Sequence, residues 1–297
     1  MGKTVILGSG GRLGAALARA WRAAGEDVVA LDRAALPLGA DGKVESVLGD
    51  IQFDVLVNCA ALTNVDYCET HPDEAFKVNG EAVNDIALHC EDRGIRCIHI
   101  STDYVFDGNT SKPYTEADAP SPISVYGTSK RMGEDAVLSA GARHWVVRVS
   151  WVFGPDRVSF VDQVISRALS ENRVDAVDDK WATPTYTLDC ATLLRPFLRR
   201  VDGGGLLHLA NTGVCTWQEY GQWALDCAKD AGLPLKTLNV GGVPMSSIKA
   251  FIAKRPIYTA METGKLASLT RLQPRSWKEA VKAHVCDQVE RGFWNVS

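Results

Sequence analysis

Tyr126 and Lys130 have the residue types and the spacing of an acid–base pair. They lie in a stretch without proline after Pro122, four positions apart, so on a helix their side chains share one face. An ammonium group beside a phenol stabilises the phenolate and lowers the phenol pKa from about 10 toward working pH, as a general acid or base requires. The same spacing also occurs by chance in many surface helices, so a catalytic role for this pair needs support from other motifs in the chain.

A hydroxyl residue, Thr102, is expected near this pair. Cys97, Ile98 and Ile100 form a short apolar run that is typical of a buried parallel strand, and Thr102 follows at its carboxyl end. Open α/β sheets bind ligands at that edge. Asp103 comes next, and two interpretations are open: it helps to orient the site, or it is a turn or cap carboxylate.

The amino-terminal segment carries a glycine pattern typical of dinucleotide binding. The sequence predicts a buried strand over residues 4–7 and a helix over residues 15–24, and between them lie Gly8, Gly11 and Gly14. In this context the first turn is tight, and backbone N–H groups at the start of the helix meet a pyrophosphate. The pattern therefore indicates a nucleotide cofactor.

The second predicted strand, residues 28–31, ends at Asp32. A carboxylate at this point accepts hydrogen bonds from the ribose diol of the cofactor and disfavours a 2′-phosphate. The adjacent Arg33 argues the other way, because a guanidinium group pairs with that phosphate. Both NADPH and NADH are therefore expected to be tolerated, and the preference between them is open.

Alternating strands and helices up to about residue 150 predict a parallel, doubly wound α/β sheet. A third strand is expected over residues 53–58, and a helix that begins near Pro72 is expected to run toward Gly94. This alternation is expected to end at about residue 152, where Gly154 and Pro155 mark the point at which the chain leaves the sheet. Later expectations are helices over 160–169 and 186–198, a strand over 206–210, and capping boxes that start helices at Thr216 and Ser276.

Composition places the chain among globular proteins, with 46% hydrophobic and 23% charged residues in 297. A net charge of −4 argues against a nucleic-acid or anionic-membrane surface. The eight cysteines are scattered without metal-ligand spacing and indicate buried thiols in a reducing compartment. The chain enters a strand at once and has no apolar region long enough for a signal or a span, so a cytoplasmic protein is expected.

Five stretches together resemble the extended short-chain dehydrogenase/reductase family. They are Gly8-x-x-Gly11-x-x-Gly14, Asn58-Cys-Ala-Ala61, Ser101-Thr-Asp-Tyr-Val-Phe-Asp-Gly108, Tyr126-Gly-x-x-Lys130-x-x-Gly-Glu134 and Arg148-Val-Ser-Trp151. The resemblance covers nearly the whole chain and implies a Rossmann-like doubly wound parallel sheet with a smaller C-terminal substrate-binding domain. Residues 1–151 would bind NAD(P), segments near 186–212 would return to that domain, and residues 152–297 would mainly bind substrate.

The resemblance also implies roles for single residues. Tyr126 would donate a proton, Thr102 would hydrogen-bond the reacting oxygen, and Lys130 would hold the nicotinamide ribose while favouring ionised Tyr126. The residues implied to contact the cofactor are Gly8, Gly11, Arg12, Leu13, Asp32, Arg33, Ala60, Ala61, Tyr126 and Lys130. Those implied to contact substrate are Thr63, Asp103, Trp151 and Arg255, with a core tryptophan and a salt-bridged arginine as the alternatives for the last two.

The implied activity is NAD(P)H-dependent reduction of the C4 keto group of a nucleotide sugar, dTDP-4-dehydro-L-rhamnose, to dTDP-L-rhamnose. Two other enzyme activities with the same catalytic residues stay open, namely reduction of a different 4-keto sugar and 4-epimerisation. A third alternative is a non-catalytic subunit that resembles the regulatory subunit of methionine adenosyltransferase.

Some relatives bind a metal at a dimer interface through glutamates, one of them in the first helix. Ala15 and Ala16 offer no ligand there, so no such metal is expected, and a homodimer stays open.

Overall fold

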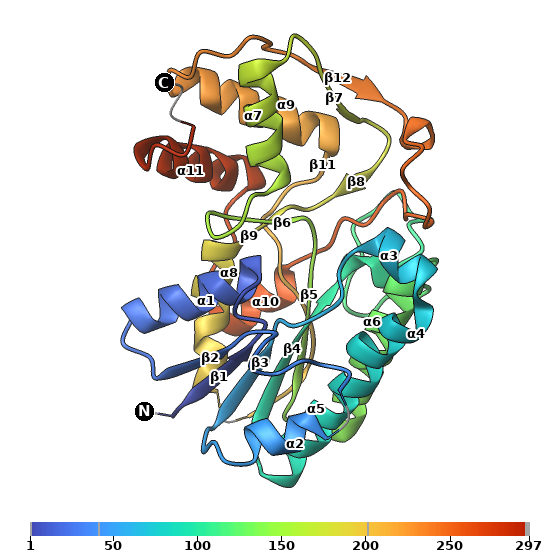
Figure 1. Cartoon of the computed structure of the whole chain (residues 1–297), viewed down its shortest axis with the longest axis vertical. Helices are drawn as coiled ribbons and strands as arrows, with labels where there is room; N and C mark the ends of the chain where they lie inside the picture. Colours follow the sequence, from blue (N-terminus) through green and yellow to red (C-terminus); the bar gives the residue numbers. More distant parts are fainter. Residues whose placement is uncertain (1, 41, 201, 295–297) are drawn as a thin grey trace.

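The computed structural model describes residues 2–40, 42–200 and 202–294. Its centre is a sheet of six strands in the order β10-β5-β4-β3-β1-β2, in which every neighbouring pair is parallel (Figure 1). The strands are β1 (Thr4–Leu7), β2 (Val28–Leu31), β3 (Val55–Asn58), β4 (Arg96–Thr102), β5 (Trp145–Val149) and β10 (Gly205–His208). The prediction of a doubly wound parallel sheet is therefore confirmed.

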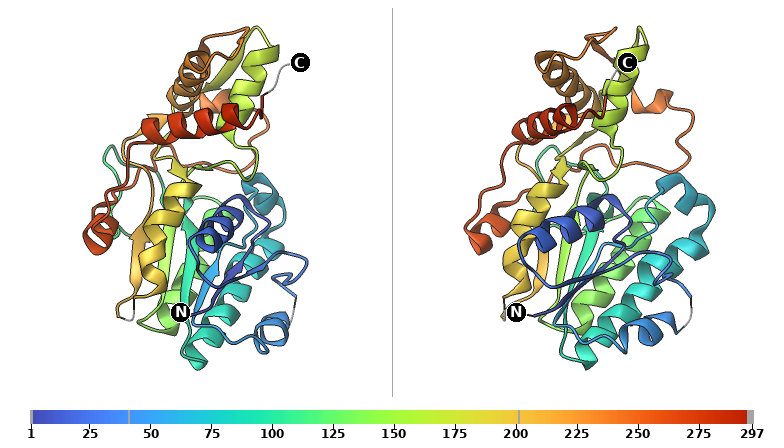
Figure 2. Two further views of the ribbon diagram at one scale, coloured as in Figure 1. Left: turned by 90° about the vertical axis from the view of Figure 1, so that its left-hand side faces the viewer. Right: turned by 60° about the vertical axis from the view of Figure 1, so that its left-hand side comes forward.

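Helices cover both faces of this sheet (Figure 2). Because side chains alternate along a strand, Ile6 packs into the apolar core on one face, whereas Val5 and Leu7 pack into the core on the other face. The first face carries α1 (Arg12–Ala23), α8 (Thr187–Leu194) and α10 (Gly264–Thr270). The second carries α2 (Lys43–Leu48), α5 (Ala82–Asp92) and α6 (Val125–Ala140).

Gly8 fixes the turn between β1 and α1. Its φ is +73°, and a Cβ there would lie 2.7 Å from the backbone nitrogen of Ala60. The helix begins at Arg12, three residues before the predicted start, with Gly14 in its first turn. A side chain at Gly14 would collide with the Gly8 carbonyl oxygen, so only glycine lets the helix start this close to the turn.

Two predicted helices are interrupted. The helix expected from Pro72 toward Gly94 consists of α4 (Pro72–Phe76), a π-helical segment η1 (Lys77–Glu81) and α5. The loop before it holds a further short helix, α3 (Val65–Thr70), capped by Asn64. The helix expected over 186–198 ends at Leu194 and continues as a 3₁₀ segment η3 (Arg195–Leu198), since Pro196 interrupts the α-helical pattern.

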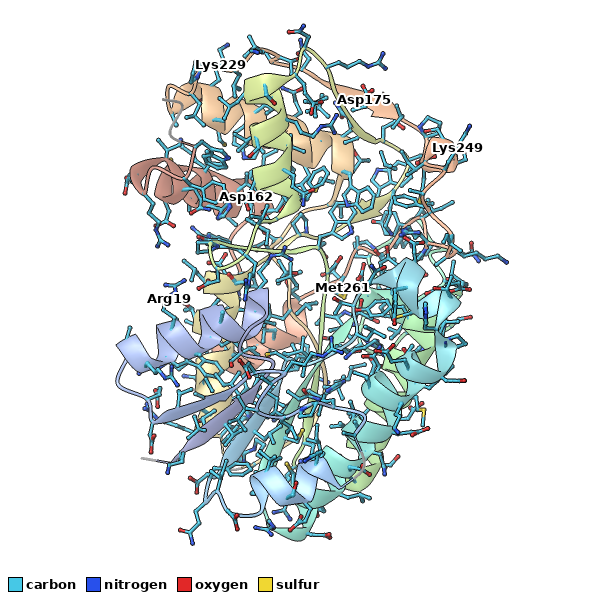
Figure 3. The ribbon with its side chains drawn as sticks, in the orientation of Figure 1. Arg19, Asp162, Asp175, Lys229, Lys249 and Met261 are labelled. Carbon is cyan, nitrogen blue, oxygen red and sulfur yellow. The ribbon has the colours of Figure 1, made fainter. Side chains whose placement is uncertain are left out.

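A second apolar core lies above the sheet in the view of Figure 1. It is built on α7 (Phe160–Ser170), α9 (Trp217–Asp230) and α11 (Trp277–Glu290). The predicted capping boxes at Thr216 and Ser276 are present at the starts of α9 and α11. Figure 3 labels Asp162 in the first turn of α7, where its carboxylate lies 2.8 Å from the His284 imidazole of α11 and links the two helices.

Three short strand pairs lie outside the central sheet: β7 (Val174–Val177) with β12 (Val240–Val243), β8 (Trp181–Ala182) with β11 (Cys215–Thr216), and β6 (Val152–Phe153) with β9 (Thr185–Tyr186). The first of these pairs packs within the second core. Two further 3₁₀ segments are η2 (Asp103–Val105) and η4 (Met245–Ser247). Within the described ranges, no helix is long and apolar enough to cross a membrane.

Candidate active site

The structure brings Thr102 and Tyr126 together, as predicted. Thr102 is the last residue of β4, and Tyr126 lies in the first turn of α6, which begins at the N-cap Ser124. The Thr102 hydroxyl accepts from the Tyr104 N–H at 3.2 Å and donates to Asp103 Oδ1 at 3.2 Å. The Thr102 side chain also lies close enough to Tyr126 to influence its phenol. The carboxyl end of β4 and the start of α6 therefore place these two hydroxyl groups near each other.

Burial determines the acidity of this phenol. Tyr126 is only 8% exposed, and burial raises its pKa above the ordinary value, although the nearby Thr102 side chain acts in the opposite direction. The predicted lowering by Lys130 is not what the structure shows. Lys130 Nζ turns toward β4 and donates to the Ile100 carbonyl oxygen at 2.7 Å. Burial lowers the pKa of Lys130 itself to about 8.

The glycine turn opens into a cavity of about 620 Å³, a size usual for cofactor sites. Six of the predicted cofactor residues line it: Gly8, Gly11, Asp32, Arg33, Ala60 and Ala61. Gly10 lines it as well, and a Cβ there would stand 3.6 Å from the Asp32 side chain. The bare backbone of this turn fits the close approach of a pyrophosphate.

Four predicted cofactor residues do not line this cavity: Arg12, Leu13, and the pair Tyr126 and Lys130 described above. Arg12 donates to the carbonyl oxygens of Val152 at 3.1 Å and Val158 at 2.5 Å, so its guanidinium holds the segment after β5. Leu13 is 8% exposed and packs in the core between α1 and the sheet, because the helix starts early and turns this side chain inward. Their contact with the cofactor stays a prediction.

Asp32 holds the turn that follows β2. Its Oδ1 accepts from the backbone N–H groups of Ala34 and Ala35, each at 3.0 Å. Asp32 and the adjacent Arg33 both line the cavity, so its wall contains charges of both signs. Glu74 and Lys77 also line it, and sequence reasoning missed them because they lie in the interrupted helix.

Asp103 orients other groups rather than presenting a free carboxylate. It is 1% exposed and accepts from the hydroxyl groups of Thr102, Ser150 at 2.8 Å and Thr259 at 2.5 Å. Burial raises its pKa. Of the two interpretations left open, an orienting carboxylate is therefore the one that its hydrogen bonds favour. Contact with substrate stays a prediction.

Lys180 is a buried charge near Asp103 that sequence reasoning missed. Its Nζ donates to the Pro256 carbonyl oxygen at 2.5 Å and lies 5.0 Å from the centre of the Tyr104 ring. Burial lowers the pKa of Lys180 to about 8, although the negative charge of Asp103 acts to raise it. No motif marks it, since its partners lie far away in the sequence.

Trp151 has an unusual backbone conformation at the end of β5, with φ at +42°. Strained conformations of large residues cost free energy and gather at functional sites. The strain turns the indole toward α9, where its ring centre lies 5.4 Å from Trp217 and 6.1 Å from Tyr220. The side chain is only partly buried, so its predicted contact with a sugar stays compatible with this packing. Thr63 is exposed in the loop after β3.

Arg255 is the salt-bridged arginine that the sequence left as an alternative. Its guanidinium pairs with the Asp66 carboxylate of α3 at 2.5 and 3.0 Å and lies 3.7 Å from the centre of the Phe251 ring. Asp66 also accepts from the N–H groups of Ile252 and Ala253, at 2.8 and 3.0 Å. The pair therefore ties α3 to the segment that crosses between the two cores.

This pair predicts a pH-dependent contribution to stability. The Arg255 hydrogen bond lowers the pKa of Asp66 to about 2. A lowered folded-state pKa means that the stabilisation is present above the unfolded value of about 4 and is lost as pH falls toward 2. We expect Asp66→Asn to lower the free energy of unfolding by roughly 1 kcal/mol at neutral pH, since a quarter of this side chain is exposed and solvent screens the charge.

Urea unfolding between about pH 7 and pH 3 measures this difference, which should shrink as the pH falls. Asp73→Asn, on the exposed surface of α4, is the matched control and should change little at any pH. A difference between Asp66→Asn and the wild type that stays constant with pH would contradict the assignment.

Buried polar residues next to Lys130 were also missed. His99 in β4 and Asn79 in η1 are both 0% exposed. Asn79 accepts from the Leu62 N–H at 2.8 Å and donates to the Ser129 hydroxyl of α6 at 3.1 Å. The only available signal was a polar side chain inside an apolar strand or helix, which a fully bonded core position also produces.

Among the residues that the structure describes, no three His, Cys, Asp or Glu side chains gather in a way that could hold a metal ion. The expected absence of a metal stays a prediction.

The sheet, the glycine turn and the paired hydroxyl groups define a nicotinamide-dependent oxidoreductase of the short-chain dehydrogenase/reductase type. A family model described as "RmlD substrate binding domain" matches residues 2–290. The chain belongs to this family.

Relatives of known role agree with this assignment. The chain is 32% identical to dTDP-4-dehydrorhamnose reductase of Escherichia coli (strain K12), covering 94% of this chain and 95% of the relative. It is 35% identical to dTDP-4-keto-6-deoxy-D-glucose reductase of Streptomyces niveus, covering 72% of this chain and 75% of that protein. The crystal structure of dTDP-4-dehydrorhamnose reductase from Bacillus anthracis str. Ames in complex with NADP has a TM-score of 0.89 and 28% identity, covering 96% of this chain and 99% of that one. The predicted resemblance, an oxidoreductase with a nicotinamide cofactor, is confirmed.

Proposed function

We propose that this protein reduces the C4 keto group of dTDP-4-dehydro-L-rhamnose to dTDP-L-rhamnose with NADPH or NADH. The observation that carries the proposal is the placement of Thr102 at the carboxyl end of β4 and Tyr126 at the start of α6, in a fold whose glycine turn opens into a cavity of cofactor size. The reductases among its relatives support this substrate class.

The side chains can carry the proton half of the reaction. Tyr126 gives its proton to the carbonyl oxygen, so its O–H bond breaks as an O–H bond forms on the sugar. The Thr102 hydroxyl, which donates to Asp103 Oδ1 in this structure, would turn its single proton to that oxygen while negative charge develops on it. The nicotinamide, when bound, supplies the hydride to C4 and is oxidised as the ketone is reduced. The glycine turn, Asp32 and Arg33 would hold the cofactor.

Loss of reduced-nicotinamide absorbance with dTDP-4-dehydro-L-rhamnose tests the proposal. NADPH and NADH are run in parallel, and the product is identified by mass spectrometry and NMR. One dTDP-L-rhamnose formed for each cofactor oxidised supports it. No oxidation by protein that still binds the cofactor would reject it.

A second candidate is reduction of another dTDP-linked 4-keto-6-deoxy sugar. The relative from Streptomyces niveus, named for such a substrate, favours this alternative. The same assay with dTDP-4-keto-6-deoxy-D-glucose separates the two, because the better substrate has the higher kcat/KM. An epimerase would interconvert sugars without net oxidation, and a regulatory subunit would show no turnover.

Arg33 is expected to favour NADPH over NADH. A guanidinium group that pairs with the 2′-phosphate is worth about 1.5–3 kcal/mol. Arg33→Ala should therefore weaken NADPH binding about tenfold or more while NADH binding changes little, as measured by fluorescence titration. Arg22→Ala, on the far side of α1 where its guanidinium binds the Val28 carbonyl oxygen, is the control. An equal loss for both cofactors would contradict the role of Arg33.

We further propose the domain division expected from the sequence, with residues 1–151 binding cofactor and 152–297 mainly binding the sugar nucleotide. The presence of β10 at the edge of the central sheet supports the return of the 186–212 segment to the first domain. A homodimer stays a prediction that light scattering can test.

A further inference from the structure

A chain of hydrogen bonds connects the cofactor cavity to Lys130 through His99. The Ala60 N–H donates to Asn58 Oδ1 at 3.0 Å, and Asn58 Nδ2 lies 3.1 Å from His99 Nδ1. On the other side of the imidazole, Nε2 lies 3.1 Å from Lys130 Nζ. All three polar side chains are at most 2% exposed, so no solvent can replace these contacts.

The donors and acceptors along this chain determine the orientation of the Asn58 amide, the tautomer of His99 and the protonation state of Lys130. Asn58 Oδ1 is taken by the Ala60 N–H, so the amide NH₂ must face the imidazole, and His99 Nδ1 must accept. A neutral imidazole then carries its proton on Nε2, directly opposite Lys130 Nζ. An ammonium group at that position would face an N–H donor. The contact is a hydrogen bond only when Lys130 accepts it as an amine.

We propose that His99 is a positioning residue for Lys130: it donates Nε2–H to Nζ and stabilises Lys130 as an unprotonated amine, which lets this lysine change its protonation state during turnover. The inference rests on the proposed function for its catalytic meaning, because the resemblance described above implies that Lys130 holds the nicotinamide ribose during the reduction. The hydrogen-bond chain itself does not depend on the sugar.

Glu134 and Cys59 are the other titratable groups near Lys130, and both raise its pKa against the larger effect of burial. Glu134, one turn along α6, is bound by the Arg148 guanidinium at 2.7 and 2.6 Å, so its charge is already compensated. Burial raises the pKa of the Cys59 thiol, on the loop after β3, to about 12 and keeps it uncharged. Burial alone already lowers the pKa of His99 well below its ordinary value, so the imidazole stays neutral.

A glycine in α6 allows the helix to approach β4 closely. Gly133 lies on the side of the helix that faces β4, and a Cβ there would collide with the Asn79 carbonyl oxygen and stand 3.4 Å from His99 Nε2. Glycine therefore lets the helix come close enough for Lys130 to reach the imidazole.

NMR of the wild-type protein without substrate tests the proposal directly. Long-range ¹H–¹⁵N spectra report the histidine tautomer, and ¹⁵N-labelled lysine reports the Nζ titration, with Lys130→Arg identifying the Lys130 signal. We expect the Nε2–H tautomer for His99 and a Lys130 midpoint near 8. An Nδ1–H tautomer, an imidazolium, or a midpoint near the ordinary value of about 10.4 would overturn it.

Asn58→Asp should reverse the direction of the hydrogen bonds along this chain, so it tests the proposal most directly. A carboxylate oxygen accepts from Nδ1–H, so His99 should switch tautomer, present an Nε2 acceptor to the ammonium, and raise the Lys130 midpoint by about one unit or more. A raised midpoint without the switch would assign the change to the carboxylate charge alone and overturn the proposal.

His144→Gln is the matched control, since His144 is also 0% exposed and accepts from Cys97 N–H of the same strand. It should leave the Lys130 midpoint unchanged, and an equal shift in this control would count against His99. Because these signals are recorded without sugar, they are independent of the reductase assay. Absent turnover with a Lys130 midpoint near 8 would reject the proposed function and leave the role of His99 intact.

Discussion

Tyr126→Phe is expected to lower turnover of the proposed reduction by about a hundredfold or more and to leave cofactor binding nearly unchanged. The substitution removes only the phenol proton, while the ring keeps its edge-to-face contact with Tyr104 at 5.6 Å between centres. Steady-state kinetics give the loss in kcat, and fluorescence titration with NADPH gives the binding constant.

Tyr186→Phe is the matched control for this experiment. Tyr186 is also buried, at 2% exposure, but it packs against Phe153 and His284 in the second core. Losing this phenol should leave kcat within about twofold. Unchanged turnover in Tyr126→Phe, or an equal loss in both variants, would remove Tyr126 as the proton donor.

The acidity of Tyr126 agrees with reduction as the working direction. Burial raises the pKa of this phenol, so it stays protonated at neutral pH, and a protonated phenol is the form that can give a proton to a carbonyl oxygen. The sequence suggested a phenol made acidic by Lys130. In the structure, Lys130 Nζ instead contacts two groups of β4, the Ile100 carbonyl oxygen and His99 Nε2.

Local patterns predicted the parts of the site that local geometry determines. The turn at Gly8 and the position of Thr102 depend on a strand end and on the residues next to it, so spacing alone located them. The same holds for the capping boxes of α9 and α11, in which both partners lie within one helical turn.

Pairs that are distant in the sequence could not be predicted in this way. Asp103 receives hydroxyl groups from positions 47 and 156 residues away, and the Asp66–Arg255 pair spans 189 residues. The hydrogen-bond role of His99 likewise depends on Asn58 in the neighbouring strand and Lys130 in a helix. Each polar residue alone has a sequence context shared by many core positions, and only the packed sheet shows which partner it meets.

The second large effect is expected at the pair that fixes α6 to β5. Glu134 and Arg148 are both 0% exposed, and the Arg148 guanidinium donates to the two carboxylate oxygens at 2.7 and 2.6 Å. Glu134→Ala would leave Arg148 charged, buried and without this partner, which costs about 3–5 kcal/mol of stability. Urea unfolding followed by circular dichroism measures the loss.

Two variants separate the buried charge from simple loss of packing. Glu171→Ala breaks an exposed pair with Arg167 on α7, in which both side chains are 46% exposed, and should cost at most about 0.5 kcal/mol. Glu134→Leu combined with Arg148→Met removes both charges and should recover most of the stability, because apolar groups of similar size often replace a buried ion pair without loss. A double variant as unstable as Glu134→Ala would show that packing, not the uncompensated Arg148 charge, dominates. Because α6 carries Tyr126 and Lys130, Glu134→Ala should also lower kcat by loosening the packing of α6 against β5. The double variant should recover kcat in proportion to the stability that it recovers.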